Sequence, residues 1–126
     1  MLEQLKAQVY KGNLDLVKHN LVISTWGNVS GFDPNTKLVV IKPSGLAYDV
    51  MTVDDMVVVD LEGVVIEGKW KPSSDTPTHL EIYKNFPDDK GVVHTHSKWA
   101  TIFAQSKKPV IPFGNAFLFR SLPQIL

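Results

Sequence analysis

The sequence contains no cysteine, which excludes a disulfide framework, a thiolate metal site and a cysteine nucleophile. No apolar run reaches the roughly 18 residues of a membrane span, and residues 1–6 lack the charged-then-apolar order of a signal peptide. The 13 basic residues balance the 13 acidic ones, which argues against binding to nucleic acid or a membrane by bulk charge. We therefore expect one cytoplasmic domain, in which any metal is bound by His, carboxylate or water.

Several functional motifs are missing as well. The chain has no GxGxxG, P-loop or GxSxG pattern, so dinucleotide binding, P-loop phosphoryl transfer and α/β-hydrolase chemistry lack support. Acidic residues are absent after Asp89, whereas five basic residues follow it. This asymmetry indicates either an anion-binding face or the chance composition of a short stretch.

The pattern of apolar residues predicts helices at both ends of the chain and a strand-rich middle. Turn signals such as Asp33-Pro34 separate short Val-rich runs, which favours hairpins and a largely antiparallel or mixed sheet covered by helices. The expected helices are residues 2–19, 76–86 and 98–105, with a helical turn at 52–55. The expected strands include residues 38–41, 57–59, 64–66 and 91–96.

Two histidines, His94 and His96, stand two residues apart in the last predicted strand. Side chains at i and i+2 share one face of a strand, so both imidazoles would reach one ion. Imidazole suits Zn²⁺ and other divalent transition metals. The alternative is two polar residues on a solvent-facing strand.

A pair of serines, Ser73 and Ser74, precedes the predicted helix that begins near Thr76. Hydroxyls and free backbone N–H groups at a helix N-terminus favour phosphate. The alternative is ordinary helix capping, which uses the same residue types. His79, in the first turn of this helix, is expected to be structural or exposed rather than a ligand.

Two further loops place glycine beside small hydrogen-bonding side chains at strand ends. The first contains Gly27 and Asn28, and the second contains Lys42, Ser44 and Gly45. Glycine allows close backbone approach to a ligand, and a lysine adds positive charge for a phosphate. Each loop alone is equally well an ordinary turn, but together with the serine pair and the His-x-His strand they supply both halves of a sugar-phosphate site.

These segments, in this order and spacing, resemble the class II aldolase/epimerase family over about residues 1–112. The resemblance rests on stretches such as Thr25-Trp26-Gly27-Asn28-Val29-Ser30, Lys42-Pro43-Ser44-Gly45, Ser73-Ser74-Asp75-Thr76-Pro77 and His94-Thr95-His96. It implies an α/β three-layer sandwich with a mainly antiparallel central sheet, incomplete in this chain. It also implies a cytoplasmic homotetramer acting on a sugar phosphate, with no nucleic-acid or membrane partner.

The resemblance further implies a Zn²⁺ ion, or another divalent cation, held by His94, His96 and a third histidine downstream. Asp75 would lie at or near the metal and act in catalysis. The residues implied in substrate and phosphate binding are Gly27, Asn28, Lys42, Ser44, Gly45, Ser73 and Ser74. Where related aldolases have Glu, this chain has Asp75, which favours the epimerase branch.

The implied reaction interconverts L-ribulose 5-phosphate and D-xylulose 5-phosphate by breaking and re-forming the C3–C4 bond, a step in the use of arabinose or ascorbate. Two alternatives remain open. One is an aldolase of the fuculose- or rhamnulose-phosphate type, and the other is a non-catalytic interaction module on the same fold.

The tail, residues 113–126, departs from the family pattern after Gly114. The third histidine, a catalytic Asp and a Tyr supplied by a neighbouring subunit have no counterparts in it. A frameshift near Gly114 or a truncation would account for the difference. We therefore expect weaker metal binding and weak or absent turnover from this exact chain.

Overall fold

The computed structural model describes residues 2–109 of the chain. These residues belong to two compact units, which meet at the bond between His96 and Ser97. The second unit contains α3 (Lys98–Gln105), an eight-residue helix on which Trp99, Ile102 and Phe103 are exposed. The predicted boundary between residues 112 and 113 and the divergent tail both lie outside the described residues, so they stay predictions.

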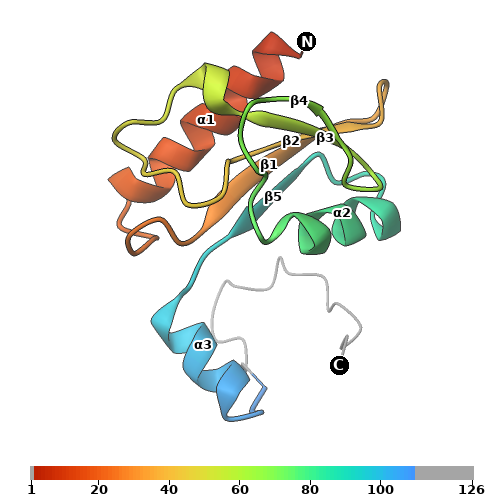
Figure 1. The fold of residues 1–126 in the computed structure, drawn as a ribbon. Coiled ribbons are helices and arrows are strands. Elements are labelled where there is room, and N and C mark those ends of the chain that lie inside the picture. Colours follow the sequence, from red (N-terminus) through yellow and green to blue (C-terminus); the bar gives the residue numbers. More distant parts are fainter. Residues whose placement is uncertain (1, 110–126) are drawn as a thin grey trace. The chain divides into compact units, whose positions relative to one another are not determined.

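A five-stranded sheet forms the centre of the first unit (Figure 1). The strand order is β4-β3-β2-β1-β5, and every neighbouring pair is antiparallel. The predicted α/β fold with a mainly antiparallel sheet is therefore confirmed. The strands are β1 (Asn28–Asp33), β2 (Leu38–Ile41), β3 (Val57–Asp60), β4 (Val65–Glu67) and β5 (Gly91–His94).

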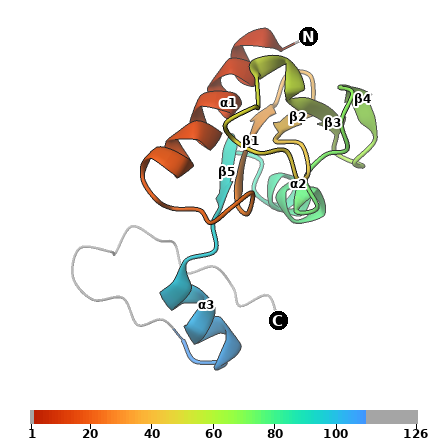
Figure 2. The same cartoon turned by 60° about the vertical axis from the view of Figure 1, so that its left-hand side comes forward.

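Two helices cover the two faces of this sheet, α1 (Glu3–Lys18) and α2 (Thr76–Asn85) (Figure 2). Side chains alternate between the faces of a strand, and the valines of the central strands follow this rule. Val40 and Val58 join the α1-side core, and Val39, Val57 and Val59 join the α2-side core. Both faces are buried, which explains the unbroken valine runs and confirms the three-layer arrangement.

Helix α1 is continuous through Gly12, although glycine is a poor helix former. A Cβ at this position would lie 3.2 Å from Val29 Cγ1, so glycine allows the helix to approach β1 closely. The next residue, Asn13, is fully buried. Its Oδ1 accepts a hydrogen bond from Val29 N at 2.9 Å, and its Nδ2 donates to Val29 O at 3.1 Å. The Asn13 side chain thus pairs both backbone hydrogen-bonding groups of Val29, near the start of β1.

Two predicted boundaries differ from the structure. The order Thr76-Pro77 predicts Thr76 as the capping residue before α2, but the structure has Asp75 at that place. Strand β5 ends at His94, so His96 lies beyond the strand. The predicted helical turn near Thr52 is present as the short 3-10 helix η1 (Val53–Asp55).

Asp55 joins η1 to the segment that follows β4. Its Oδ1 accepts hydrogen bonds from Trp70 Nε1 at 2.8 Å and Lys69 Nζ at 2.9 Å. Its Oδ2 accepts from Thr52 N at 2.9 Å and Thr52 Oγ1 at 2.7 Å. The hydrogen bonds from Trp70, then Lys69 and Thr52, hold the pKa of Asp55 well below its usual range.

We expect Asp55 to stabilise the fold at neutral pH and to make this stability sensitive to acid. A carboxyl whose folded pKa is depressed stabilises the fold above its unfolded pKa, and the contribution is lost as pH falls through the folded value. Stability should therefore decline below about pH 4. Asp55→Asn should cost about 2 kcal/mol at pH 7 and flatten this decline, as measured by urea unfolding against pH. If the free energy of unfolding of Asp55→Asn fell in acid as steeply as that of the unaltered chain, Asp55 would not be the cause of the decline.

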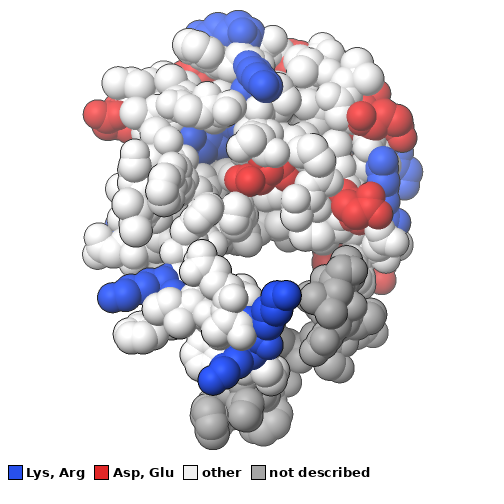
Figure 3. Space-filling model, turned by 60° about the horizontal axis from the view of Figure 1, so that its bottom comes forward, with Lys and Arg blue, Asp and Glu red and all other residues white. Residues whose placement is uncertain are grey.

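On the face shown in Figure 3, acidic and basic groups stand singly or in small groups among uncharged residues, in keeping with their equal numbers. Within residues 2–109, no helix has the length and apolar character required to cross a bilayer.

Candidate functional site

A pocket of about 390 Å³ opens in the first unit, where the start of β1 meets the residues before α2. It brings together three loops that are far apart in the sequence, and His96 contributes to its wall. Of the predicted site residues, only His94 is not part of the lining. The lining residues are Thr25, Trp26, Gly27, Asn28, Lys42, Pro43, Ser44, Gly45, Ser73, Ser74, Asp75 and His96.

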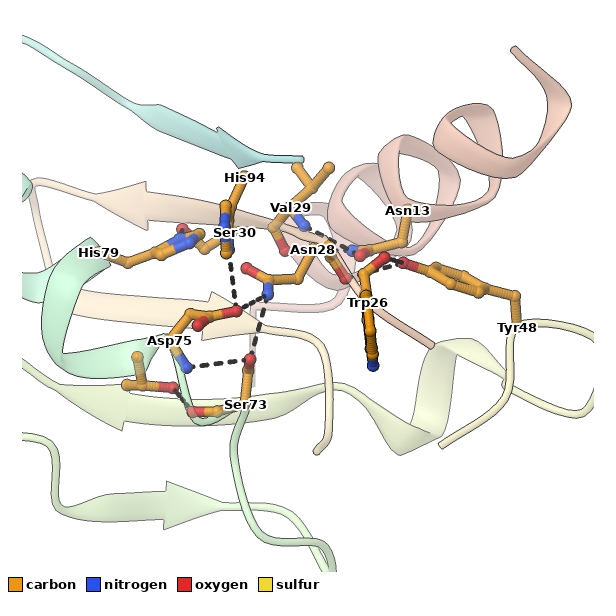
Figure 4. Close-up of polar contacts among 12 residues, drawn as sticks. Asn13, Trp26, Asn28, Val29, Ser30, Tyr48, Ser73, Asp75, His79 and His94 are labelled. Carbon is orange, nitrogen blue, oxygen red and sulfur yellow. Dashed lines mark hydrogen bonds and ion pairs between the residues drawn. The ribbon is translucent and has the colours of Figure 1, made fainter. Parts of the chain in front are cut away.

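The Asp75 carboxylate receives hydrogen bonds from two strands at once (Figure 4). Asn28 Nδ2, at the start of β1, donates to Asp75 Oδ2 at 2.6 Å. His94 Nδ1, at the end of β5, lies 2.9 Å from the same oxygen. Asn28 and His94 are paired in the β1–β5 ladder, so the sheet itself places both donors opposite the start of α2.

The ionisation of Asp75 follows from these contacts. Burial raises the pKa of its carboxyl, but the hydrogen bonds from Asn28 and His94 outweigh that effect and hold the pKa below the usual value. Asp75 is therefore a carboxylate at neutral pH, able to accept a proton or bind a cation.

Asn28 is itself held in place by a serine. Its Nδ2 also donates to Ser73 Oγ at 3.1 Å, and that hydroxyl accepts a second hydrogen bond from Asp75 N at 3.2 Å. Asn28 Oδ1 is buried and has no hydrogen-bond partner among the described residues. Buried acceptors are normally paired, so this oxygen is an exception among the described residues.

The two histidines lie side by side although only His94 is in the strand. Their ring centroids are 4.8 Å apart, and the Trp26 ring centroid is 5.4 Å from that of His96. The contact between His94 Nδ1 and Asp75 leaves His94 Nε2 to bind a cation, with the carboxylate orienting the ring behind it. The donor types fit a divalent cation, but residues 2–109 contain no group of three such donors in place.

Lys42 is almost completely buried, and its ammonium is occupied by its own loop. Lys42 Nζ donates to Leu46 O at 2.7 Å and to Pro43 O at 3.3 Å. Burial lowers the pKa of this group. The observed contacts give Lys42 a role in shaping the loop, and its predicted contact with phosphate stays a prediction.

Glycine is required at two positions in the lining for different reasons. Gly27 has φ of +89°, and a Cβ there would lie 2.5 Å from Val22 Cγ1 and 3.0 Å from His94 O. Gly45 has φ of +70°, but a Cβ there would meet nothing within 4 Å. Gly27 therefore permits a close approach to the end of β5, whereas Gly45 is needed for its backbone conformation alone.

A second polar cluster lies behind the site. Ser30 Oγ is 2.7 Å from His79 Nδ1 and 2.7 Å from Tyr83 OH, and all three residues are buried. Burial lowers the pKa of His79 to about 4, so the ring is neutral at pH 7. The expectation that His79 is structural agrees with this geometry. The sequence pattern included Ser30 in a loop motif but gave no sign of Tyr83 or of this cluster, because it does not show which buried hydroxyls face a helix histidine.

Comparison with known proteins identifies the architecture. The family model described as "Class II Aldolase and Adducin N-terminal domain" matches residues 7–123. The chain belongs to this family. Its resemblance to class II aldolases and epimerases, expected from the loop and histidine motifs, is thereby confirmed.

Curated relatives of this class II aldolase domain include the protein named L-ribulose-5-phosphate 4-epimerase UlaF from Salmonella paratyphi B. It is 50% identical over 125 residues, which cover 97% of this chain and 55% of the relative. The protein of the same name from Salmonella paratyphi A matches equally well. The chain thus spans about half the length of these relatives.

Solved structures show the same class II aldolase fold. An L-fuculose 1-phosphate aldolase superposes with a TM-score of 0.78 at 34% identity, covering 83% of this chain and 50% of that one. YgbL from Klebsiella pneumoniae, described as a putative aldolase/epimerase/decarboxylase, has a TM-score of 0.72 at 28% identity, covering 82% and 50%.

Proposed function

We propose that this chain carries the substrate-binding half of a metal-assisted sugar-phosphate epimerase that interconverts L-ribulose 5-phosphate and D-xylulose 5-phosphate. The observation that carries the proposal is the Asp75 carboxylate, bonded to Asn28 and His94 at the edge of the pocket. The resemblance to proteins named L-ribulose-5-phosphate 4-epimerase supports the same substrate class. A cytoplasmic homotetramer is part of this proposal.

The reaction cannot proceed by simple deprotonation, because the hydrogen on C4 is not acidic. Loss of the C4 hydroxyl proton instead lets the C3–C4 bond break, leaving its electron pair on the three-carbon enediolate and releasing glycolaldehyde phosphate. The aldehyde rotates within the pocket, the bond re-forms on its other face, and the proton returns to the new hydroxyl. Atoms and electrons balance without a redox cofactor.

One group of residues in this chain would bind the phosphate end of the substrate, and another would act on the carbon atoms that react. Ser44, Gly45, Ser73 and Ser74 line the pocket, and their hydroxyl and N–H groups are suited to retain the phosphate of the aldehyde fragment while it turns. Asp75 accepts or returns a hydroxyl proton at its carboxylate. His94 and His96 would hold a divalent cation, whose chemistry is to stabilise negative charge on oxygen as a Lewis acid.

The second candidate is an aldolase that cleaves the same kind of bond and releases the aldehyde. The superposition on an L-fuculose 1-phosphate aldolase favours it, whereas Asp75 in place of the Glu expected of such aldolases favours the epimerase. A non-catalytic binding module on this fold is the third candidate.

The test uses the full chain with Zn²⁺ and L-ribulose 5-phosphate, followed by NMR. An epimerase forms D-xylulose 5-phosphate without free aldehyde, and an aldolase accumulates glycolaldehyde phosphate. Binding of both Zn²⁺ and L-ribulose 5-phosphate without turnover would agree with a substrate-binding half of the enzyme. Binding of neither would refute the proposal. Asp75→Asn should abolish any turnover, and the exposed Asp88→Asn is the matched control.

A further inference from the structure

Tyr48 connects the two glycine loops of the pocket. It belongs to the segment after Gly45, yet its hydroxyl donates a hydrogen bond to Gly27 O at 2.7 Å and lies 3.4 Å from Trp26 O (Figure 4). The contact crosses from the loop after β2 to the residues that lead into β1. Pattern analysis of the sequence gave no reason to single out this tyrosine.

The ring of Tyr48 is held in place by the core. Its side chain is 8% exposed and packs in the α1-side core with Met51 and Met56. Burial raises the pKa of the phenol to about 12, so the hydroxyl keeps its proton and donates. Lys42 Nζ lies 4.7 Å from the ring centroid, the geometry of a cation–π contact. The same ammonium donates to Leu46 O, which fixes the loop between Gly45 and Tyr48.

The Tyr48 hydrogen bond reaches the residue next to the one that binds the Asp75 carboxylate. Gly27 immediately precedes Asn28, whose side chain bonds Asp75 at 2.6 Å. Gly27 adopts a positive φ against the carbonyl of His94, so the orientation of its own carbonyl sets how the chain enters β1. A hydrogen bond to that carbonyl therefore acts one residue away from the amide that holds Asp75.

We propose that Tyr48 is a positioning residue that locks the Gly45 loop to the Gly27 loop and so keeps the phosphate-binding and Asp75 ends of the pocket at a fixed separation. The role in phosphate binding rests on the proposed function. The locking of the two loops does not, because it is a property of the free protein.

Tyr48→Phe keeps the ring, and with it the packing and the Lys42 contact, but removes the hydroxyl. We expect the backbone amide signals of Gly27 and Leu46 to shift and broaden in ¹H–¹⁵N NMR spectra of the free chain. With inorganic phosphate as the probe, the dissociation constant should rise about fivefold, the effect of one neutral hydrogen bond.

The matched control is Tyr83→Phe, which removes a buried tyrosine hydroxyl bonded to Ser30 on the other side of the sheet. Both substitutions should lower the melting temperature to a similar extent, because each removes one buried tyrosine hydroxyl. Tyr83→Phe should leave the Gly27 and Leu46 amides in place. Unchanged loop amides in Tyr48→Phe, or equal changes in both variants, would overturn the inference. Perturbed amides in a chain that does not bind phosphate would support the loop lock and count against the proposed function.

Discussion

Replacing His94 with alanine is expected to weaken Zn²⁺ binding by about 100-fold or more, since loss of a ligand should exceed the 10–100-fold typical of an outer-shell change. The His94 and His96 rings lie side by side, and His94 contacts the Asp75 carboxylate. With two such donors, removal of either imidazole leaves too few to compete with water. Isothermal titration of Zn²⁺ into the full chain measures the effect directly.

Two further variants test whether the loss of Zn²⁺ affinity is specific to His94. Asp75→Asn retains both imidazoles and alters the group that orients His94, so its affinity should fall by about 10-fold. His19→Ala removes an exposed imidazole at the end of α1 and should have no effect. If His94→Ala and His19→Ala bound Zn²⁺ alike, or if the unaltered chain bound none, the proposed cation site would be wrong.

Gly27→Ala is expected to destabilise the first unit by about 3 kcal/mol, the sum of strain at positive φ and overpacking. The new Cβ would lie 2.5 Å from Val22 Cγ1 and 3.0 Å from the carbonyl of His94. The valine methyl can move, but the carbonyl belongs to the β1–β5 ladder and cannot move without breaking it. Urea unfolding followed by circular dichroism measures the loss.

Gly45→Ala provides the matched control. Gly45 also has positive φ, but an added Cβ would meet nothing within 4 Å. Its substitution should therefore cost only the conformational strain, about 1 kcal/mol. Equal losses in the two variants would show that the close approach to β5 does not matter at Gly27.

Much of the fold could be predicted from local pattern. The valine runs of β2 and β3 and the turn at Asp33-Pro34 indicated antiparallel strands, and the Thr76-Pro77 pair indicated the start of α2 to within one residue. These features depend on neighbours in the chain, so the sequence expresses them directly. The strand predicted through His96 was too long, because His94 is paired with Asn28, the first residue of β1, and the pairing with β1 does not extend beyond His94.

The sequence by itself determined the chemistry available to this protein: no thiol, a His-x-His segment, a serine pair before a helix and two loops that each contain a glycine. Only the tertiary structure decided how these groups are used. It placed Asn28 and His94 on one carboxylate, occupied Lys42 with its own loop, buried His79 against Ser30, and brought the Tyr48 hydroxyl to Gly27. Those outcomes depend on which distant segments meet across the sheet and which polar groups burial leaves in need of a partner, and no short stretch of sequence contains that information.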